Sequence, residues 1–382
     1  MIHFDIDARL ARLRSRMAAE GVDAFIALKS VNTEYLTGFD YIRDNSDPHA
    51  VLITADTARF MTDSRYLEVA QSQAAQSTVE DSLWQVDDIG SKVVTKDMHE
   101  LWDLKQFTKI GLEDSLSYRV FTLIEKSAGP AKVIPAKNWV EDIRSVKDAA
   151  EIERIKSAQT ITDLTFTHLC GLIKAGMTEK EIALEIEYRV RKLGAEGTSF
   201  SPIVASGPNG SLPHAVPTDR IIEPGDLLTL DFGASYGGYC SDMTRTIFVG
   251  GTDEAGEPVQ PSAEQRKVFD AVLAAQQASL AAIKAGASAK EVDAAGREII
   301  VEAGYGDYFI HGTGHGVGLY IHELPNSSPR SEGKLTAGEV MTVEPGIYLP
   351  GKFGVRIEDM VVVTDDGSLN ITESPKDLMY RR

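Results

Sequence analysis

The stretch 227–246, LLTLDFGASYGGYCSDMTRT, reads as an apolar strand, a glycine-rich turn and a return strand. Asp231 closes the first strand and Asp242 opens the second, with Gly237 and Gly238 in the turn between them. Such a hairpin brings both carboxylates toward one point. Because unpaired carboxylates at close range repel each other, a divalent cation is the usual reason to hold them together. Solvated aspartates at strand ends are equally common, so the pair alone leaves a structural and a metal-binding interpretation open.

The composition is that of an ordinary globular protein, and 382 residues are enough for two domains with separate cores. The 39 basic and 57 acidic residues give a net charge of −18, which disfavours nucleic acid and anionic membranes as partners. We find no signal-peptide core and no apolar run of spanning length. Cys170 and Cys240 are too few for a disulfide framework. We therefore expect a cytoplasmic protein.

Residues 1–145 are expected to form an α/β domain, because short apolar runs alternate there with helical stretches. No constellation of metal ligands or nucleophiles precedes residue 145, so this domain is expected to shape access to a site or to mediate dimerisation. A polar loop that follows one of its strands is assigned to surface or interface: Arg43, Asp44 and Asp47. A long helical pattern begins near residue 149 and predicts a second domain over 146–382.

The second domain contains an internal repeat. The segments 173–182 (IKAGMTEKEI) and 283–292 (IKAGASAKEV) each predict a helix that begins with a capping box, Thr178 with Glu181 and Ser288 with Glu291. The segments 224–233 (PGDLLTLDFG) and 337–346 (AGEVMTVEPG) then match each other in the same order. A duplicated unit of this kind packs most simply about a pseudo-two-fold axis.

The repeat gives each aspartate of the hairpin a counterpart. Asp231 aligns with Glu344, and Glu358 in the segment GVRIED (354–359) corresponds to Asp242. Equivalent carboxylates face each other across the axis of a duplicated domain, so all four are expected to point to one site. Such a convergence favours metal binding over a solvated surface.

Four histidines lie near the expected site loops: His214, His311, His315 and His322. Three of them belong to the glycine-rich segment 311–323, HGTGHGVGLYIHE. This segment loosely resembles a dinucleotide-binding loop, but no amphipathic helix follows it and a phosphate has no need of imidazoles. Neutral imidazole is a good ligand for Mn, Fe, Co or Zn, and His315 in the centre of the segment is the best candidate.

Four carboxylates and one neutral imidazole match the charge of two divalent cations and leave room for a bridging hydroxide. His214 and His322 then remain for proton handling or substrate contact, although either alone is more often an ordinary surface or core histidine. Arg356 lies two residues before Glu358, on the same strand face. Its guanidinium either binds a substrate carboxylate or neutralises a metal ligand.

The pattern of Asp231, Asp242, His315, Glu344 and Glu358 resembles the "pita-bread" metallopeptidases, which include methionine aminopeptidase, aminopeptidase P and prolidase. The segments TDSRY (62–66), HGTGHGVGLYIHE and VEPGIY (343–348) are similar to the proline-specific branch. The resemblance implies a creatinase/prolidase-like N-terminal α/β domain and a pseudo-two-fold α+β catalytic domain. It also implies a homodimer in which the first domain lies in the interface or over the cleft.

The same resemblance implies a dinuclear site, most often with manganese in this branch, and with cobalt or zinc as alternatives. Asp231 would hold one ion, His315 and Glu344 the other, and Asp242 and Glu358 would bridge them. Glu344 would also shuttle the proton of the attacking hydroxide. His322 and His214 would contact the substrate carbonyl and the leaving prolyl nitrogen. The residues that would line the proline pocket or bind its carboxylate are His311 and Arg356.

We therefore expect a metal-dependent exopeptidase that hydrolyses the Xaa-Pro bond, either at the N-terminus of longer peptides or in dipeptides. The motifs do not separate these two activities. Two other hypotheses stay open: a metal-dependent lyase or hydrolase of a small metabolite on the same fold, and a non-catalytic binding module. Creatinase-type members lack the metal ligands that are complete here, and a binding module predicts protein that folds with about zero metal per chain.

Overall fold

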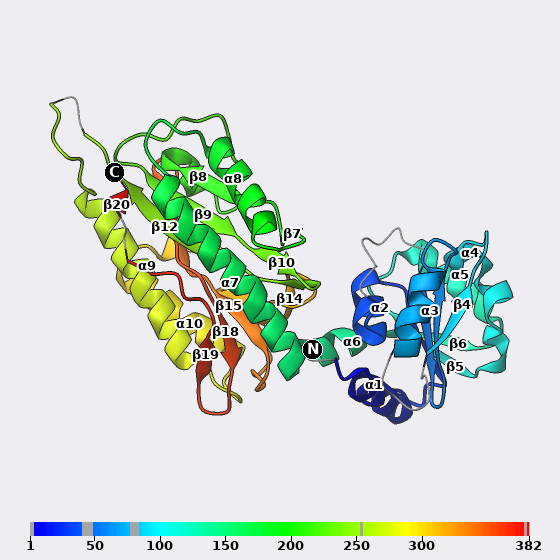
Figure 1. The fold of residues 1–382 in the computed structure, drawn as a ribbon. Helices are drawn as coiled ribbons and strands as arrows, with labels where there is room; N and C mark the ends of the chain where they lie inside the picture. Colours follow the sequence, from blue (N-terminus) through cyan, green and yellow to red (C-terminus); the bar gives the residue numbers. More distant parts are fainter. Residues whose placement is uncertain (1–3, 40–48, 77–83, 253–254, 378–379, 382) are drawn as a thin grey trace. The chain divides into compact units, whose positions relative to one another are not determined.

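The computed structural model describes residues 4–39, 49–76, 84–252, 255–377 and 380–381. The polar loop with Arg43, Asp44 and Asp47 lies outside the described residues. The chain divides into two compact units, Met1–Arg144 and Ser145–Arg382 (Figure 1). Among the described residues, no helix is long and apolar enough to cross a membrane.

The first unit is built on a six-stranded sheet with the strand order β4-β3-β2-β1-β5-β6. Strand β1 pairs in antiparallel fashion with β2 and in parallel fashion with β5. The strands are β1 (Ala24–Ala27), β2 (Ala50–Thr54), β3 (Ala58–Thr62), β4 (Trp84–Asp88), β5 (Lys109–Glu113) and β6 (Lys132–Ala136). The helices are α1 (Ile6–Glu20), α2 (Ser30–Thr37), α3 (Leu67–Gln76), α4 (Val94–Leu101), α5 (Tyr118–Ala128) and α6 (Trp139–Ser145). The expected α/β architecture of this unit is confirmed.

The second unit combines four long helices with four small sheets, and α7, α9 and α10 lie along one face of the strands (Figure 1). The helices are α7 (Ala149–Leu172), α8 (Glu179–Lys192), α9 (Ala263–Ala282) and α10 (Ala289–Glu302). A four-stranded sheet has the order β20-β12-β9-β8, and a five-stranded sheet has the order β14-β13-β15-β18-β19. The strands β7, β10 and β11 form a third sheet, and β16 and β17 form a fourth.

The bounds of these strands follow the chain. In the first half they are β7 (Gly197–Thr198), β8 (Ile203–Ser206), β9 (Leu227–Phe232), β10 (Ala234–Tyr236), β11 (Tyr239–Cys240) and β12 (Met243–Val249). In the second half they are β13 (Gly314–Gly316), β14 (Glu323–Ser327), β15 (Val340–Val343), β16 (Gly346–Leu349), β17 (Phe353–Arg356), β18 (Asp359–Val363), β19 (Ser368–Asn370) and β20 (Tyr380–Arg381). Short 3-10 helices are η1 (Leu104–Gln106), η2 (Gly207–Ser211) and η3 (Gly306–Tyr308).

The repeat is visible in the topology, because the neighbours β8-β9-β12 of one sheet correspond to β13-β15-β18 of the other. Each set follows a helix pair, α7 with α8 or α9 with α10. Strands β9 and β15 lie in different sheets, and the halves touch at the strands that carry the second acid of each pair. There the backbone N–H of Glu358 donates to the carbonyl oxygen of Thr244 at 3.0 Å. The α+β architecture with two related halves is thus confirmed.

The two helix starts of the repeat differ in one respect. Thr178 and Glu181 form the expected capping box at the start of α8. Ser288 precedes α10, but its side chain makes no capping hydrogen bond, so the prediction of a capping box is wrong there. The carbonyl oxygen of Gly333 accepts the N–H of Ala289 at 3.1 Å instead. A backbone acceptor therefore takes a donor of the first turn.

The hairpin of the opening stretch is confirmed. β9 pairs in antiparallel fashion with β12, and Asp231 lies opposite Thr244 in the register. At the tip β10 pairs with β11, and Gly237 and Gly238 have φ angles of 57° and 81°, which favour glycine. The hairpin therefore carries Asp231 near the end of one strand and Asp242 just before the next.

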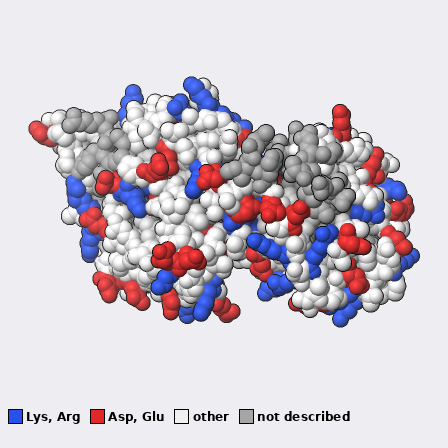
Figure 2. Space-filling view, turned by 60° about the horizontal axis from the view of Figure 1, so that its bottom comes forward, with Lys and Arg blue, Asp and Glu red and all other residues white. Residues whose placement is uncertain are grey.

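The surface carries both signs of charge. Figure 2 shows Lys and Arg side chains interspersed with Asp and Glu over the face that it presents. Among the described residues on that face there is no continuous basic surface, and this distribution agrees with the net charge of −18.

Candidate metal centre

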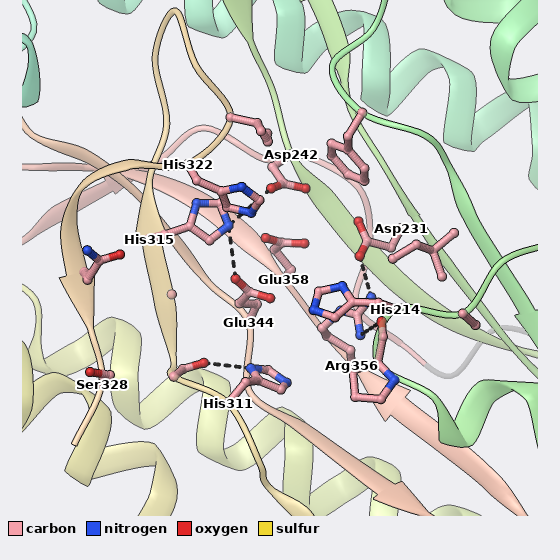
Figure 3. A pocket seen from close by; sticks show the side chains of 18 of the residues that line it. His214, Asp231, Asp242, His311, His315, His322, Ser328, Glu344, Arg356 and Glu358 are labelled. Carbon is pink, nitrogen blue, oxygen red and sulfur yellow. Dashed lines mark hydrogen bonds and ion pairs between the residues drawn. The ribbon is translucent and has the colours of Figure 1, made fainter. Parts of the chain in front are cut away.

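The five expected ligands lie at the ends or in the middle of short strands and line one cavity (Figure 3). Asp231 belongs to β9, His315 is the middle residue of β13, and Glu344 follows β15 directly. Asp242 and Glu358 each lie one residue before a strand, β12 and β18. The pseudo-two-fold arrangement of these strands thus directs four acids and one imidazole into the same volume of about 980 Å³.

The glycines on either side of His315 let β13 fit between β14 and β15. A Cβ on Gly314 would lie 2.0 Å from the carbonyl oxygen of Thr342, and one on Gly316 would lie 2.0 Å from that of Leu324. No side chain is compatible with such approaches. The glycine-rich segment therefore serves the packing of strands around the imidazole.

Three of the ligands form a compact cluster. Asp242, His315 and Glu358 each offer an atom within 4.8 Å of the others, which is close enough for one shared ion. His315 Nε2 lies 3.6 Å from Asp242 Oδ2 and 3.3 Å from Glu344 Oε1. Asp231 borders this cluster, and its Oδ2 accepts a hydrogen bond from Nη2 of Arg356.

The hydrogen bonds around the acids leave some oxygen atoms free. Thr244 Oγ1 donates to Glu358 Oε2 at 2.7 Å, and Thr342 Oγ1 donates to Glu344 Oε1 at 3.1 Å. The second oxygens, Oε1 of Glu358 and Oδ1 of Asp231, are buried and have no hydrogen-bond partner within the described part of the chain. A buried acceptor without a partner is costly, and a cation removes that cost. Carboxylates and an imidazole form a donor set that fits a divalent transition metal.

The electrostatics of the metal-free cluster lead to the same conclusion. Burial raises the pKa of Asp231, and burial together with neighbouring carboxylates raises those of Asp242 and Glu358 well above the ordinary values. Burial also opposes the charged pair of His315 and Glu344. Their hydrogen bond nevertheless raises the pKa of His315 to about 9 and lowers that of Glu344 to about 2. Without metal, the cluster therefore gathers protons, and the imidazolium is its central cation.

The three remaining histidines line the same cavity (Figure 3). The ring of His322 stacks edge-on against that of His315, with centroids 4.5 Å apart. His311 Nε2 lies 2.8 Å from the hydroxyl of Tyr348, and its Nδ1 lies 2.8 Å from the carbonyl oxygen of Gly312. Burial lowers the pKa of both His311 and His322. His214 is exposed to the cavity from the loop that follows η2.

Arg356 is 3 % exposed and uses its donors within the protein. Nε donates to Thr244 Oγ1 at 3.0 Å and Nη1 to the hydroxyl of Tyr348 at 2.7 Å, while Nη2 contacts Asp231. Of the two roles expected from the sequence, neutralising a ligand is the one that this geometry supports. Arg356 meets a substrate in this arrangement only if one of these bonds opens.

Sequence reasoning missed three residues that support the site: Thr244, Thr342 and Tyr348. Thr244 follows Asp242 by two residues and Thr342 precedes Glu344 by two. Side chains two apart in a strand share a face, so this spacing could have identified both threonines. Tyr348 is buried, and burial raises its pKa to about 12. No local pattern predicts its contact with His311, because that contact depends on how β16 and β13 pack.

The cavity walls differ in character. One wall is apolar: Phe200, Pro202, Ile203, Val216 and Pro217. The opposite wall is polar: Asn326, Ser328, Arg330 and Ser331. Arg330 is exposed and makes no ion pair with any residue that the structure describes. An unpaired guanidinium on a cavity wall is suited to an anionic group of a ligand.

Comparison with known protein families covers almost the whole chain. Residues 153–365 match the model of metallopeptidase family M24, and residues 9–146 match the creatinase/prolidase N-terminal domain. A relative from Bacillus subtilis, described as an uncharacterised peptidase, is 40% identical over 97% of this chain and 99% of its own. The Xaa-Pro dipeptidase of Pyrococcus furiosus is 36% identical over 97% of this chain and 99% of its own.

Solved structures give the same picture. The Xaa-Pro dipeptidase from Bacillus anthracis matches with a TM-score of 0.88 and 38% identity, covering 98% of this chain and 100% of its own. An X-Pro aminopeptidase from Thermotoga maritima matches with a TM-score of 0.84 and 37% identity, covering 97% of this chain and 99% of its own.

Proposed function

Because the chain belongs to metallopeptidase family M24 and carries a creatinase/prolidase N-terminal domain, we propose that it is an exopeptidase that hydrolyses the Xaa-Pro bond with two metal ions. Metal-dependent Xaa-Pro peptidase activity is supported by relatives with that name over nearly the full length. The observation that carries the proposal is the cavity itself, in which four acids and His315 converge beside three further histidines.

We assign the metal ligands as Asp231, Asp242, His315, Glu344 and Glu358. The two buried oxygens without a protein partner, on Asp231 and Glu358, support this assignment. The ions expected are divalent, with manganese first and cobalt or zinc as alternatives. When bound, they supply Lewis acidity and lower the pKa of a water molecule toward neutrality.

The chain's own residues supply proton transfer and orientation. Glu344 is the proposed proton acceptor, because the low pKa of its carboxyl keeps it ionised at neutral pH. His322 has a lowered pKa, so its imidazole is neutral at pH 7 and can donate N–H to a substrate carbonyl. His214 faces the cavity from another wall and is proposed to contact the prolyl nitrogen. His311 is held by Tyr348 and is proposed to line the proline pocket.

An Xaa-Pro bond has no N–H, so an enzyme cannot recognise it through a backbone donor. Recognition must use the ring and the groups on either side of the bond. The apolar wall that includes Ile203 and Val216 offers a surface for side chains or the pyrrolidine ring. The cavity therefore has both an apolar surface and a reactive cluster within one volume.

Arg330 favours dipeptides over longer peptides as the substrates. In a dipeptide the proline carboxylate is free and close to the scissile bond, whereas in a longer peptide it is an amide. An exposed guanidinium without an ion pair on the polar wall suits the carboxylate and gains nothing from the amide. The test is hydrolysis of an Xaa-Pro dipeptide against an Xaa-Pro-Xaa tripeptide by manganese-loaded protein. Faster cleavage of the tripeptide would instead make the protein an aminopeptidase. A homodimer and a cytoplasmic location remain predictions from the sequence.

A further inference from the structure

The carboxylate of Glu179 is fully buried at the first position of α8, outside the ligand set. Its two oxygens accept five hydrogen bonds. Oε1 accepts from the backbone N and the Oγ of Ser206, both at 2.7 Å. Oε2 accepts from Nδ2 of Asn209 at 2.9 Å, and from the backbone N and Oγ1 of Thr218 at 2.9 and 2.7 Å. Such a number of donors marks a deliberately anchored acid.

The donors lie at the two ends of one loop. Ser206 is the last residue of β8, and Thr218 lies at the far end of the segment 207–217. One rigid side chain therefore closes the base of this loop from both sides. The loop carries His214 and Val216, and both of these residues line the cavity of the metal centre.

His214 depends on its loop for its position. Its ring makes no hydrogen bond with another residue in the described ranges, and its side chain is exposed (Figure 3). The contacts beside it are made by backbone, such as the carbonyl oxygen of Pro213, which accepts from Arg356 Nη1 at 3.3 Å. Whatever fixes the backbone of the loop thus fixes the imidazole.

The repeat shows that the fold alone does not need this acid. The residue equivalent to Glu179 in the second half is Ala289, which also begins a helix of fourteen residues. There the equivalent segment is tied by Ser327 Oγ, which donates to the carbonyl oxygen of Ala289 at 2.7 Å. Its histidine, His322, is supported by the ring of His315. Only the first half has a histidine without such support, and only that half has the buried acid.

We propose that Glu179 is a positioning residue that holds the loop 207–217 so that His214 faces the ligand cluster. The inference rests on the proposed function, because it gives His214 a role in peptide hydrolysis. Gln at this position cannot serve both ends of the loop, since its amide nitrogen would face the backbone N–H of Ser206 or Thr218. Asp is one methylene shorter and cannot span the two ends.

The first experiment compares Glu179→Gln and Glu179→Asp with the control Glu181→Gln. Glu181 lies on the same helix, two residues further, and bonds only to Thr178, in a capping box that glutamine preserves. We expect both Glu179 variants to bind as much metal as the wild type and to lose on the order of tenfold to a hundredfold in kcat/KM. The control keeps both properties. Unchanged kcat/KM in the Glu179 variants overturns the proposal.

The second experiment is a double-mutant cycle with His214→Ala. If Glu179 acts through His214, then Glu179→Gln has little further effect on kcat/KM in the His214→Ala protein. Equal losses in both backgrounds would show that Glu179 acts elsewhere. If Glu179→Gln does not fold, Thr218→Val replaces it in the cycle, because Thr218 is exposed and removes one of the five bonds.

Amide hydrogen exchange separates this proposal from the proposed function. In Glu179→Gln, we expect faster exchange over 207–217 and unchanged exchange in β9 and β12. If the metal-loaded wild type cleaves no Xaa-Pro peptide, the proposed function fails, while exchange still reports whether Glu179 holds the loop. Unchanged exchange in the loop contradicts the positioning role whatever the activity.

Discussion

Nη2 of Arg356 contacts Oδ2 of Asp231, which joins the end of β17 to the end of β9 in a fully buried ion pair. The same guanidinium also donates to Thr244 and Tyr348. Arg356 therefore orients a proposed ligand and compensates its charge, while the other oxygen of Asp231 stays available for a cation.

We predict that Arg356→Lys lowers the affinity of the protein for one of its two metal ions. An ammonium cannot make the forked contacts of a guanidinium, so Asp231 loses its fixed orientation. Loss of a partner of this kind typically costs about 10-fold to 100-fold in metal affinity. Isothermal titration of metal-free protein with Mn²⁺ measures this effect, and unchanged affinity for both ions would contradict it.

Ligands and proton-handling residues are expected to respond differently to alanine substitution. Asp231→Ala and Glu344→Ala should abolish activity and lower the metal content. His322→Ala should reduce turnover, by about 100-fold or more if it acts as a general acid, while the metal stays bound. Elemental analysis alongside kinetics distinguishes the two classes. A His322→Ala protein without metal would move His322 into the ligand set.

Metal binding should become weaker as the pH falls from 8 to 6. In the metal-free state the pKa of His315 is about 9, and the carboxyls of Asp242 and Glu358 have raised pKa values. The metal-bound state needs these groups deprotonated, so binding releases protons and is opposed by acid. Titration calorimetry in buffers of different ionisation enthalpy counts the protons. An affinity that does not change over this range would argue against the assigned cluster.

The first unit should lose stability as the pH rises from about 4.5 to about 7. Burial raises the pKa of Glu113 from 4.5 to about 7 in the folded protein, although the backbone N–H groups of Leu28 and Lys29 donate to it. The unfolded chain releases this proton first, so the stabilisation is present below pH 4.5 and is lost through pH 7. The shift corresponds to roughly 3 kcal/mol.

All three tryptophans lie in this unit, at positions 84, 102 and 139, so their fluorescence reports its unfolding in the full chain. Urea unfolding at pH 5 and pH 7 should show a larger free energy of unfolding at pH 5. In Glu113→Gln the difference between the two pH values should shrink. A wild-type protein that is more stable at pH 7 by this probe would contradict the prediction.

Arg330→Ala should raise KM for an Xaa-Pro dipeptide and leave KM for an Xaa-Pro-Xaa tripeptide nearly unchanged. The reason is that only the dipeptide presents a carboxylate to the polar wall, and a charged hydrogen bond contributes about 1.5–3 kcal/mol. Lys174→Ala is a matched control, because it also removes one cation but lies outside the residues that line the cavity. Equal changes in KM for both substrates would remove Arg330 from the dipeptide preference.

Much of the site could be predicted because its residues repeat. Each proposed acid lies at the end of an apolar strand, and the duplication pairs Asp231 with Glu344. Strand ends that pack about one axis must converge, so local patterns were enough to collect the candidates. The domain fold followed from the same strands and from the helices that precede them.

The remaining features depend on contacts between distant segments. The partner of Arg356 is set by the packing of β17 on β9, and the partner of His311 is set by β16. Ser288 fits the pattern of a helix cap, but a carbonyl from residue 333 takes the adjacent donor. Glu179 looks like an ordinary acid in a helix's first turn, and its role depends on a loop more than twenty residues away.

The most direct test is hydrolysis of a Leu-Pro dipeptide by protein loaded with two equivalents of Mn²⁺, with Leu-Ala as the matched substrate and metal-free protein as the control. The account predicts release of free proline only from Leu-Pro and only with metal. Protein that holds two ions per chain and leaves Leu-Pro and Leu-Pro-Xaa peptides intact would contradict the central claim.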